Sequence, residues 1–268
     1  SRRQRQMCIR DSTKILGGTV EEIARSKCGI IKGGNAVAAL DIPEPAMEVI
    51  RERCAQTGAR LITPDRSELE ILEKPGLRGS RFRYRGQEYR LYLGGAYQVT
   101  NALTAIEALT CAGITPAHIA MGIERARIPA RMELLPGDIL LDGGHNPQAA
   151  RAVRSALEDS GYERRTAFIG MMNTKDHRAF LQEILPCFDR VYFCDGFSEG
   201  EVPAEELRRI SGLDGAEIFH SPREALKFAR RDREGGLMYF GGSFYFAAAV
   251  RELSLIHISE PTRQAEIS

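Results

Sequence analysis

The sequence predicts an α/β protein built from two successive parts, the second of which is a mostly parallel sheet covered by helices. From residue 131 onward short apolar strands alternate with helical stretches, a pattern that indicates crossover units in a parallel sheet. The chain has 268 residues, of which 43% are apolar and 27% charged, as is typical of a globular protein. This length fits one large domain or two smaller ones, and we place the boundary near Ile128–Ala130.

The second part, residues 131–253, contains five apolar runs that predict strands. The strands are expected at Ile139–Asp142, Thr166–Gly170, Val191–Cys194, Ala216–Phe219 and Leu237–Phe240. The helices between them are expected at Pro147–Asp159, Asp176–Leu185, Ala204–Ile210 and Pro222–Arg231. Such a sheet is Rossmann-like, with helices covering both faces.

The first part, residues 13–127, mixes helices with shorter strands. Thr19 followed by Glu22 forms a capping box, so a helix is expected to run to about Lys27 and to end at Gly29. The other expected elements are a strand from Asn35, a helix at Pro43–Thr57, a strand at Leu61–Thr63, a hairpin around Gly86-Gln87, and helices at Asn101–Cys111 and Ala117–Ala126.

The charge balance excludes simple classes of binding protein. Lys and Arg number 37 and Asp and Glu 36, for a formal net charge of +1, so the basic excess of a nucleic-acid binder is absent. No apolar run reaches the ~18 residues of a membrane-spanning helix. The six cysteines form no CxxC pair and no cluster with the spacing of a zinc site. Cys187 and Cys194 lie in apolar stretches and are expected to be buried. We expect a cytoplasmic protein.

The two ends differ in composition from the rest of the chain. Residues 1–12 contain four Arg and one Asp, and residues 254–268 contain one Arg and two Glu. We interpret both segments as tails foreign to the native protein. Ordinary frayed termini are the alternative.

The segment Asp142-Gly-Gly-His-Asn-Pro147 follows a predicted strand and opens a helix. Open α/β folds bind ligands at the carboxyl ends of parallel strands, and a helix N-terminus there attracts phosphate. The glycines would let a nucleotide approach the backbone. The structural alternative is a plain turn with Asn146 as N-cap and Pro147 as the first helical residue.

Four further segments carry weaker signals. They are Ser26–Lys32, Gly95–Ala102, Pro129–Glu133 and Phe240–Phe244. Taken alone, each also fits a structural role: a lysine on a helix dipole, a helix start capped by Thr100 or Asn101, an exposed arginine, and a strand-to-helix turn. The last would place Ser243 at the same sheet edge as Asp142.

The order of these segments resembles the folylpolyglutamate synthase and dihydrofolate synthase branch of the Mur ligase family. The shared pattern is Lys27-x-Gly-Ile-x-Lys, Gln98-x-x-Asn-Ala, Arg131-x-Glu, Asp142-Gly-x-His-Asn-Pro and Gly242-Ser. Residues 13–24 and Asn173-Thr-Lys-Asp176 also resemble segments of that family, so the similarity covers about residues 13–253. It implies the C-terminal portion of a P-loop-type central domain followed by a C-terminal ligase domain.

This resemblance implies an ATP- and magnesium-dependent ligase of folate and one-carbon metabolism, with ATP lying between the two domains. The family phosphorylates a carboxylate of dihydropteroate or of a folate and then couples it to L-glutamate. No nucleic acid or membrane partner is expected, and the chain is expected to be a monomer.

The resemblance also implies roles for individual residues. Lys27 would be carbamylated and act as a ligand near magnesium. Catalytic roles would fall to Lys27, His145 and Ser243, and nucleotide contacts to Asn101, Arg131, Asp142 and Asn146.

Two departures from the family pattern predict that the chain itself lacks turnover. The family's magnesium-binding histidine would precede Thr13, where this sequence has Ser12, and no Gly-Lys dipeptide is present, so the P-loop is missing. The alternatives are a Mur ligase that adds amino acids to a peptidoglycan precursor, and a non-catalytic nucleotide-binding or protein-interaction module. A Rossmann dehydrogenase is disfavoured because the sequence has no GxGxxG.

Overall fold

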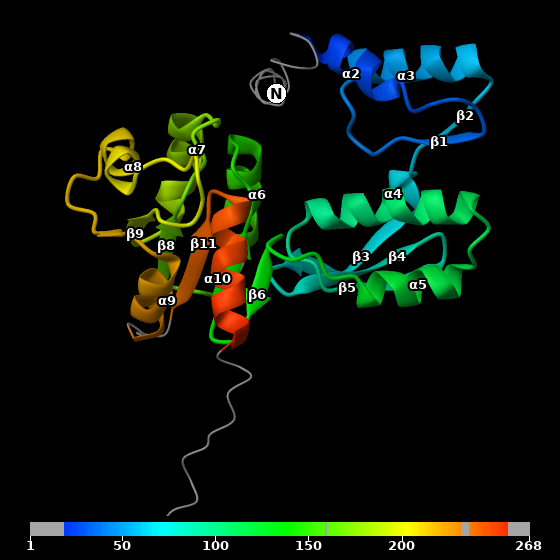
Figure 1. Ribbon diagram of the computed structural model, residues 1–268. Coiled ribbons are helices and arrows are strands. Elements are labelled where there is room, and N and C mark those ends of the chain that lie inside the picture. Colours follow the sequence, from blue (N-terminus) through cyan, green and yellow to red (C-terminus); the bar gives the residue numbers. More distant parts are fainter. Residues whose placement is uncertain (1–18, 159, 232–235, 257–268) are drawn as a thin grey trace, which may run out of the picture. The chain divides into compact units, whose positions relative to one another are not determined.

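The computed structural model describes residues 19–158, 160–231 and 236–256 (Figure 1). It divides into two compact units, called unit 1 up to Arg127 and unit 2 from Ile128. The expected foreign tails lie outside the described residues, except that 254–256 continue the last helix.

The first layer of unit 1 consists of two helices and a two-stranded parallel sheet. Helix α2 (Val20–Cys28) begins at the predicted capping box, in which the Thr19 hydroxyl and the Glu22 carboxylate each accept the other residue's backbone N–H. Strand β1 (Asn35–Val37) pairs in parallel with β2 (Arg60–Ile62), and α3 (Glu44–Thr57) forms the crossover between them. Helices α2 and α3 pack against each other.

The second layer of unit 1 is an antiparallel meander with helices packed on it. After the 3-10 turn η1 (Arg66–Glu68), the strands are β3 (Leu69–Gly76), β4 (Gly79–Tyr84) and β5 (Gln87–Leu91). Helices α4 (Tyr97–Cys111) and α5 (Pro116–Arg125) follow. A core that includes Phe82, Tyr89 and Leu103 joins the strands to these helices.

Three details of unit 1 differ from the prediction. The hairpin turn is Arg85-Gly86, both with positive φ, because Tyr84 pairs with Gln87 and closes the ladder one residue earlier. Helix α4 begins at Tyr97 rather than Asn101, so neither Thr100 nor Asn101 caps it. Strand β3 was not predicted, since bulges after Ile71 and Glu73 break its alternation.

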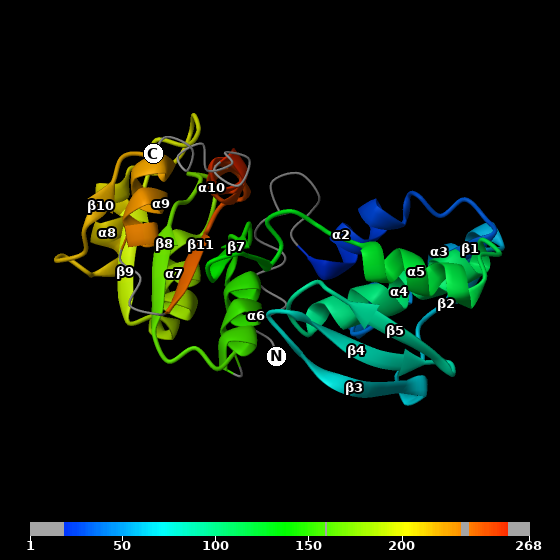
Figure 2. The same cartoon turned by 90° about the horizontal axis from the view of Figure 1, so that it is seen from below.

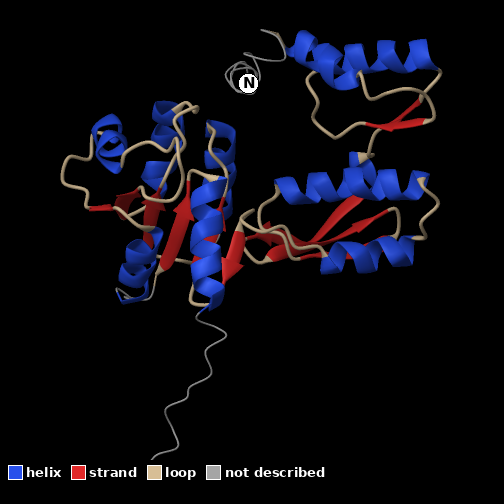
Figure 3. Ribbon diagram, in the orientation of Figure 1, coloured by secondary structure: helices blue, strands red, loops and turns tan. Residues whose placement is uncertain are grey.

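Unit 2 is built on a six-stranded sheet in the order β10-β9-β8-β11-β7-β6. Its strands are drawn in red in Figure 3. The five predicted strands are confirmed: β7 (Ile139–Asp142), β8 (Arg165–Ile169), β9 (Arg190–Cys194), β10 (Ile218–Phe219) and β11 (Leu237–Gly241). These five strands run parallel to one another. The unpredicted β6 (Glu133–Leu135) adds one antiparallel edge.

Helices cover both faces of this sheet, as predicted. One face carries α6 (Pro147–Glu158), α7 (His177–Ile184) with the 3-10 turn η2 (Leu185–Cys187), and α8 (Ala204–Ser211). The other face carries α9 (Pro222–Arg231) and α10 (Phe244–Ile256) (Figure 2). Phe168, Phe240 and Phe246 fill the core beneath α9 and α10. Cys187 and Cys194 are buried as expected, and burial raises the pKa of both thiols.

Across the part of the chain that the structure describes, no helix is both long and apolar enough to cross a lipid bilayer.

Limited proteolysis is expected to cut unit 1 before unit 2. Strands β1 and β2 form only a two-stranded sheet, which stabilises its surroundings poorly, whereas unit 2 encloses a continuous core. Mass spectrometry of the fragments should therefore find an early species that retains residues 131–253. Equal survival of the two units would contradict this expectation.

Candidate functional site

The candidate site lies at the carboxyl edge of the unit 2 sheet, where two strand-to-helix turns meet. Strands β7 and β11 are parallel neighbours, and Asp142 is in register with Gly241 at their ends. The turn 143–146 leads from β7 into α6, and Gly242-Ser243 leads from β11 into α10. Ser243 and Asp142 therefore lie at the same sheet edge.

Asp142 is buried and bound on both carboxylate oxygens. Its side chain accepts the Met132 N–H at 3.0 Å on Oδ2 and the Gly144 N–H at 2.8 Å on Oδ1. Burial raises the pKa of this carboxyl, while these two backbone bonds and the charge of Arg131 lower it. Asp142 thus ties the segment around Arg131 to the turn that follows β7.

Both glycines of this turn are required by internal packing. A Cβ on Gly143 would lie 2.9 Å from Phe244 Cα, and one on Gly144 would lie 2.4 Å from Asp142 Oδ1. Internal packing against the Asp142 carboxylate and α10 therefore accounts for both glycines, and the room that they would leave for a nucleotide stays a prediction.

The Arg131 side chain is exposed on a tightly held segment. Its neighbours Ala130 and Met132 have φ of 53° and 45°, in the left-handed region that few non-glycine residues adopt. The Gly143 N–H donates to the Ala130 carbonyl at 2.7 Å. Because both neighbours are buried, the segment presents Arg131 outward from a fixed backbone.

Arg251 on α10 supports this segment and was not predicted. Its Nε lies 2.9 Å from both oxygens of Glu133, and Glu133 in turn accepts the Ala130 N–H at 2.9 Å. Arg251 follows Glu133 by 118 residues, so local spacing carried no signal for this contact.

The remaining unit 2 candidates stand at the helix starts. Asn146 Oδ1 accepts the Ala149 N–H at 2.9 Å, so the structural alternative, Asn146 as N-cap of α6, is confirmed. The His145 Nδ1 lies 3.1 Å from the Gly143 carbonyl. The Ser243 hydroxyl is buried and accepts the Tyr245 N–H at 3.2 Å.

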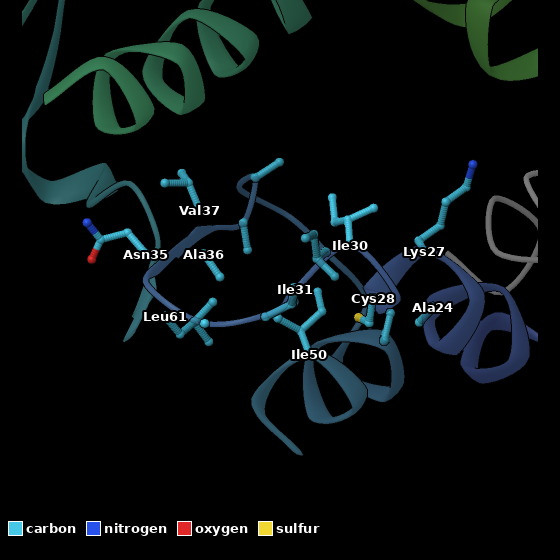
Figure 4. A pocket seen from close by; sticks show the side chains of 15 residues that line it. Ala24, Lys27, Cys28, Ile30, Ile31, Asn35, Ala36, Val37, Ile50 and Leu61 are labelled. Carbon is cyan, nitrogen blue, oxygen red and sulfur yellow. The ribbon is translucent and has the colours of Figure 1, made fainter. Parts of the chain in front are cut away.

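Lys27 and Asn101 belong to unit 1 and lie on different helices. Lys27 is exposed in the last turn of α2, and Figure 4 shows its amine pointing away from the other labelled side chains. Asn101 is exposed on α4, where its side-chain amide donates to Gln98 Oε1 at 3.0 Å.

Among the described residues, no three His, Cys, Asp or Glu side chains gather closely enough to hold a metal ion. At the candidate site, both carboxylate oxygens of Asp142 are bonded to backbone N–H groups. The residues that the structure describes therefore do not fit a magnesium site composed of these side chains.

A His–Asp pair at the same sheet edge predicts a pH dependence of stability. The His220 Nδ1 lies 2.9 Å from Asp195 Oδ1, and this partner raises the pKa of His220 above its ordinary 6.5. Its stabilising contribution is fully present below pH 6.5 and is lost as the pH rises through the raised value. An NMR titration should show the raised pKa, and Asp195→Asn should return it towards 6.5. An unchanged titration would contradict the pairing.

The chain is similar in sequence to known proteins. Residues 130–244 match the "Mur ligase, glutamate ligase domain". The folylpolyglutamate synthase of Lacticaseibacillus casei is 30% identical over 264 residues, which are 91% of this chain and 60% of that protein. The dihydrofolate synthase/folylpolyglutamate synthase of Bacillus subtilis is 23% identical over 257 residues, 90% of this chain and 60% of that protein.

Solved structures share this fold. E. coli FolC in complex with DHPP and ADP matches with a TM-score of 0.75 and 25% identity, over 92% of this chain and 59% of that one. Mycobacterium tuberculosis folylpolyglutamate synthase complexed with ADP and AMPPCP matches in fold with a TM-score of 0.75 at 22% identity, over 87% of this chain and 59% of that one. The chain spans about 60% of the length of the curated relatives it matches. Unit 2 therefore has the fold of a Mur ligase C-terminal domain, and the chain is similar in sequence to folylpolyglutamate and dihydrofolate synthases.

Proposed function

We propose that this chain is part of an ATP-dependent ligase that joins L-glutamate to folate or to dihydropteroate. The observation that carries the proposal is the 30% identity with a folylpolyglutamate synthase across 91% of the chain. The relatives whose structures hold ADP support a nucleotide as the second ligand.

The proposed reaction must first activate a carboxylate. A carboxylate is a poor electrophile, so ATP first transfers its γ-phosphoryl group to the pterin-linked carboxylate and leaves as ADP. The α-amine of glutamate then attacks the acyl phosphate, an amide forms, and phosphate departs. The protein's task is to orient these groups and to stabilise the negative charge that develops on the phosphoryl oxygens.

Unit 2 supplies an edge suited to a nucleotide. We assign contacts with it to Arg131, Asp142 and Asn146, and contacts with the phosphates or with glutamate to His145 and Ser243. Arg131 is exposed on a segment whose backbone is held by Asp142 and Glu133, so binding would require little ordering of the backbone at this position. The N-termini of α6 and α10 add partial positive charge at the same edge.

Unit 1 supplies Asn101 for the nucleotide and Lys27 for catalysis. An ammonium cannot bind Mg²⁺, but a carbamate on Lys27 would provide the oxygen ligands that this ion prefers. When bound, Mg²⁺ would neutralise phosphate charge. We further propose that the enzyme works in the cytoplasm as a monomer.

The test is a chimera in which residues 19–253 replace the matched part of the L. casei synthase. The chimera is expected to release ADP and to glutamylate a reduced folate or dihydropteroate, in a reaction that requires glutamate. The 268-residue chain alone is expected to show no turnover, because its sequence has no P-loop to hold the phosphates.

Two variants of the chimera sharpen the test. Arg131→Ala is expected to lower kcat/KM about 100-fold, the usual order for one charge-stabilising group. Arg223→Ala, which removes an exposed arginine of α9, is the matched control and should leave activity unchanged. A folded chimera without activity would refute the proposed function, and turnover by the chain alone would refute the role of the missing P-loop.

A further inference from the structure

Helix α10 carries a cation that reaches the segment around Arg131. The helix packs against β7 and β11 (Figure 2), and Val250, directly before Arg251, is fully buried in the core of unit 2. The Arg251 Nε lies 2.9 Å from both carboxylate oxygens of Glu133. The exposed fractions of these two side chains are 32% and 21%, so they form a partly buried ion pair that starts from a backbone held by the core.

Glu133 connects this cation to Ala130. It is the first residue of β6, where it is in register with Leu141 of β7, so its own backbone is fixed by the sheet. Its Oε2 accepts both the Arg251 Nε–H and the Ala130 N–H, each at 2.9 Å. A chain of contacts therefore runs from α10 through Glu133 to the residue that precedes Arg131.

Ala130 needs this support because of its backbone conformation. With a φ of 53° it lies in the left-handed region, which is unfavourable for a residue that has a Cβ. A strained residue keeps such a conformation only where its surroundings hold it. The Ala130 N–H is held by Glu133, and its carbonyl is held by the Gly143 N–H. Loss of the first contact would let the backbone before Arg131 relax.

We propose that Arg251 is a positioning residue that acts on the nucleotide through Arg131. Without Arg251, Glu133 would carry a partly buried negative charge whose counter-ion is gone, and rotamers that turn the carboxylate towards water would be favoured. The Ala130 N–H would then lose its acceptor, and Arg131 would no longer extend from a fixed backbone. The inference rests on the proposed function, in which Arg131 contacts the nucleotide.

The first measurement is hydrogen exchange in the 268-residue chain, which requires no activity. Arg251→Ala is expected to speed exchange of the Ala130 amide about tenfold or more, because the acceptor of this amide is released. The Met132 amide, which Asp142 holds, should change less. Glu252→Ala alters the next residue of α10, whose side chain is exposed, and as the matched control it should leave both amides unchanged. Equal exchange of the Ala130 amide in the two variants would overturn the proposal.

The second measurement is the steady-state kinetics of the chimera that contains residues 19–253. Arg251→Ala is expected to lower kcat/KM for ATP about tenfold, less than Arg131→Ala does, because the Arg131 guanidinium is still present but is misplaced. The KM for glutamate should stay close to that of the parent chimera, whereas general destabilisation would alter both substrates alike. Arg251→Lys keeps a cation beside Glu133 and should recover part of the loss, although it lacks the planar guanidinium.

A double-mutant cycle tests whether Arg251 acts through Arg131. In the Arg131→Ala background, Arg251→Ala should lower kcat/KM no further, because the effects of residues that act through one another do not add. The same loss in both backgrounds would reject this route. If Arg251→Ala does not fold, Glu133→Gln takes its place in the cycle, since it keeps an oxygen for the Ala130 N–H and removes the charge that binds Arg251.

The outcomes distinguish the role of Arg251 from the proposed function. An active chimera in which Arg251→Ala behaves as Glu252→Ala does would reject the role of Arg251 and leave the function standing. A folded chimera without activity would refute the function, and the role of Arg251 in that function would fall with it. The exchange of the Ala130 amide would still show whether Arg251 holds the segment.

Discussion

Replacing Asp142 with alanine is expected to lower the free energy of unfolding of unit 2 by about 3 kcal/mol. The substitution leaves two backbone N–H groups, those of Met132 and Gly144, without the carboxylate that they now contact. Each buried donor without a partner costs about 1–3 kcal/mol. The alanine side chain has no acceptor atom, and no other side chain named at this turn would accept these two N–H groups.

Hydrogen exchange under increasing denaturant would measure this loss for unit 2 alone. Asp142→Asn should be milder than Asp142→Ala, because its amide oxygen can still accept one of the two N–H groups. Asp214→Ala, an exposed carboxylate on the turn after α8, is the control and should change stability by less than about 0.5 kcal/mol. Equal stability of the Asp142 and Asp214 variants would show that the two bonds contribute nothing.

The same substitution links stability to the proposed function. Since Asp142 holds the Met132 backbone, its loss should release the Arg131 segment even where the unit stays folded. In the chimera, Asp142→Ala should then raise the KM for ATP at temperatures well below unfolding.

Replacing Phe168 with alanine is expected to destabilise unit 2 by about 3–5 kcal/mol, the range for removing a large aromatic from a core. Phe168 is fully buried in β8, one of the two central strands of the sheet. Its ring stacks on Phe240 with centroids 4.5 Å apart and on Tyr192 at 5.1 Å. Removing it would leave a cavity bordered by aromatic rings, which cannot collapse without moving the sheet or α9.

The unit 2 melting temperature would measure this effect. Tyr245→Ala is the matched control, since its ring is 58% exposed and its backbone N–H would keep the Ser243 contact. Phe168→Leu should recover part of the stability by refilling the space. A loss for Phe168→Ala no larger than that for Tyr245→Ala would contradict the assigned core.

The sequence was sufficient to predict unit 2 because its core strands are short apolar runs between recognisable helices. Strands β8 and β9 are buried on both faces. Because both faces are buried, each strand is visible in the sequence as a continuous apolar run. Strand β6 escaped prediction because Glu133-Leu-Leu is a three-residue edge that shows no period. It exists only through its pairing with β7.

The sequence predicted which residues stand at the candidate site, but it did not predict the contacts that hold them. Asp142, His145, Asn146 and Ser243 were chosen for their place after strands, and the sheet brings Asp142 and Ser243 to one edge. The partners of Asp142 are backbone groups, one of them ten residues earlier, and backbone groups carry no signature in side-chain sequence. For the same reason the packing role of Gly143 and Gly144 could not be distinguished from room for a ligand.

The position of β11 has a consequence for biosynthesis. This strand is the last of the described strands along the chain, yet it lies between β8 and β7 in the middle of the sheet. On the ribosome, β7 and β8 emerge early and must wait with a gap between them until β11 arrives. The Arg131 segment also gains its Arg251 support only then, so a nascent chain would acquire this edge in one late, cooperative step.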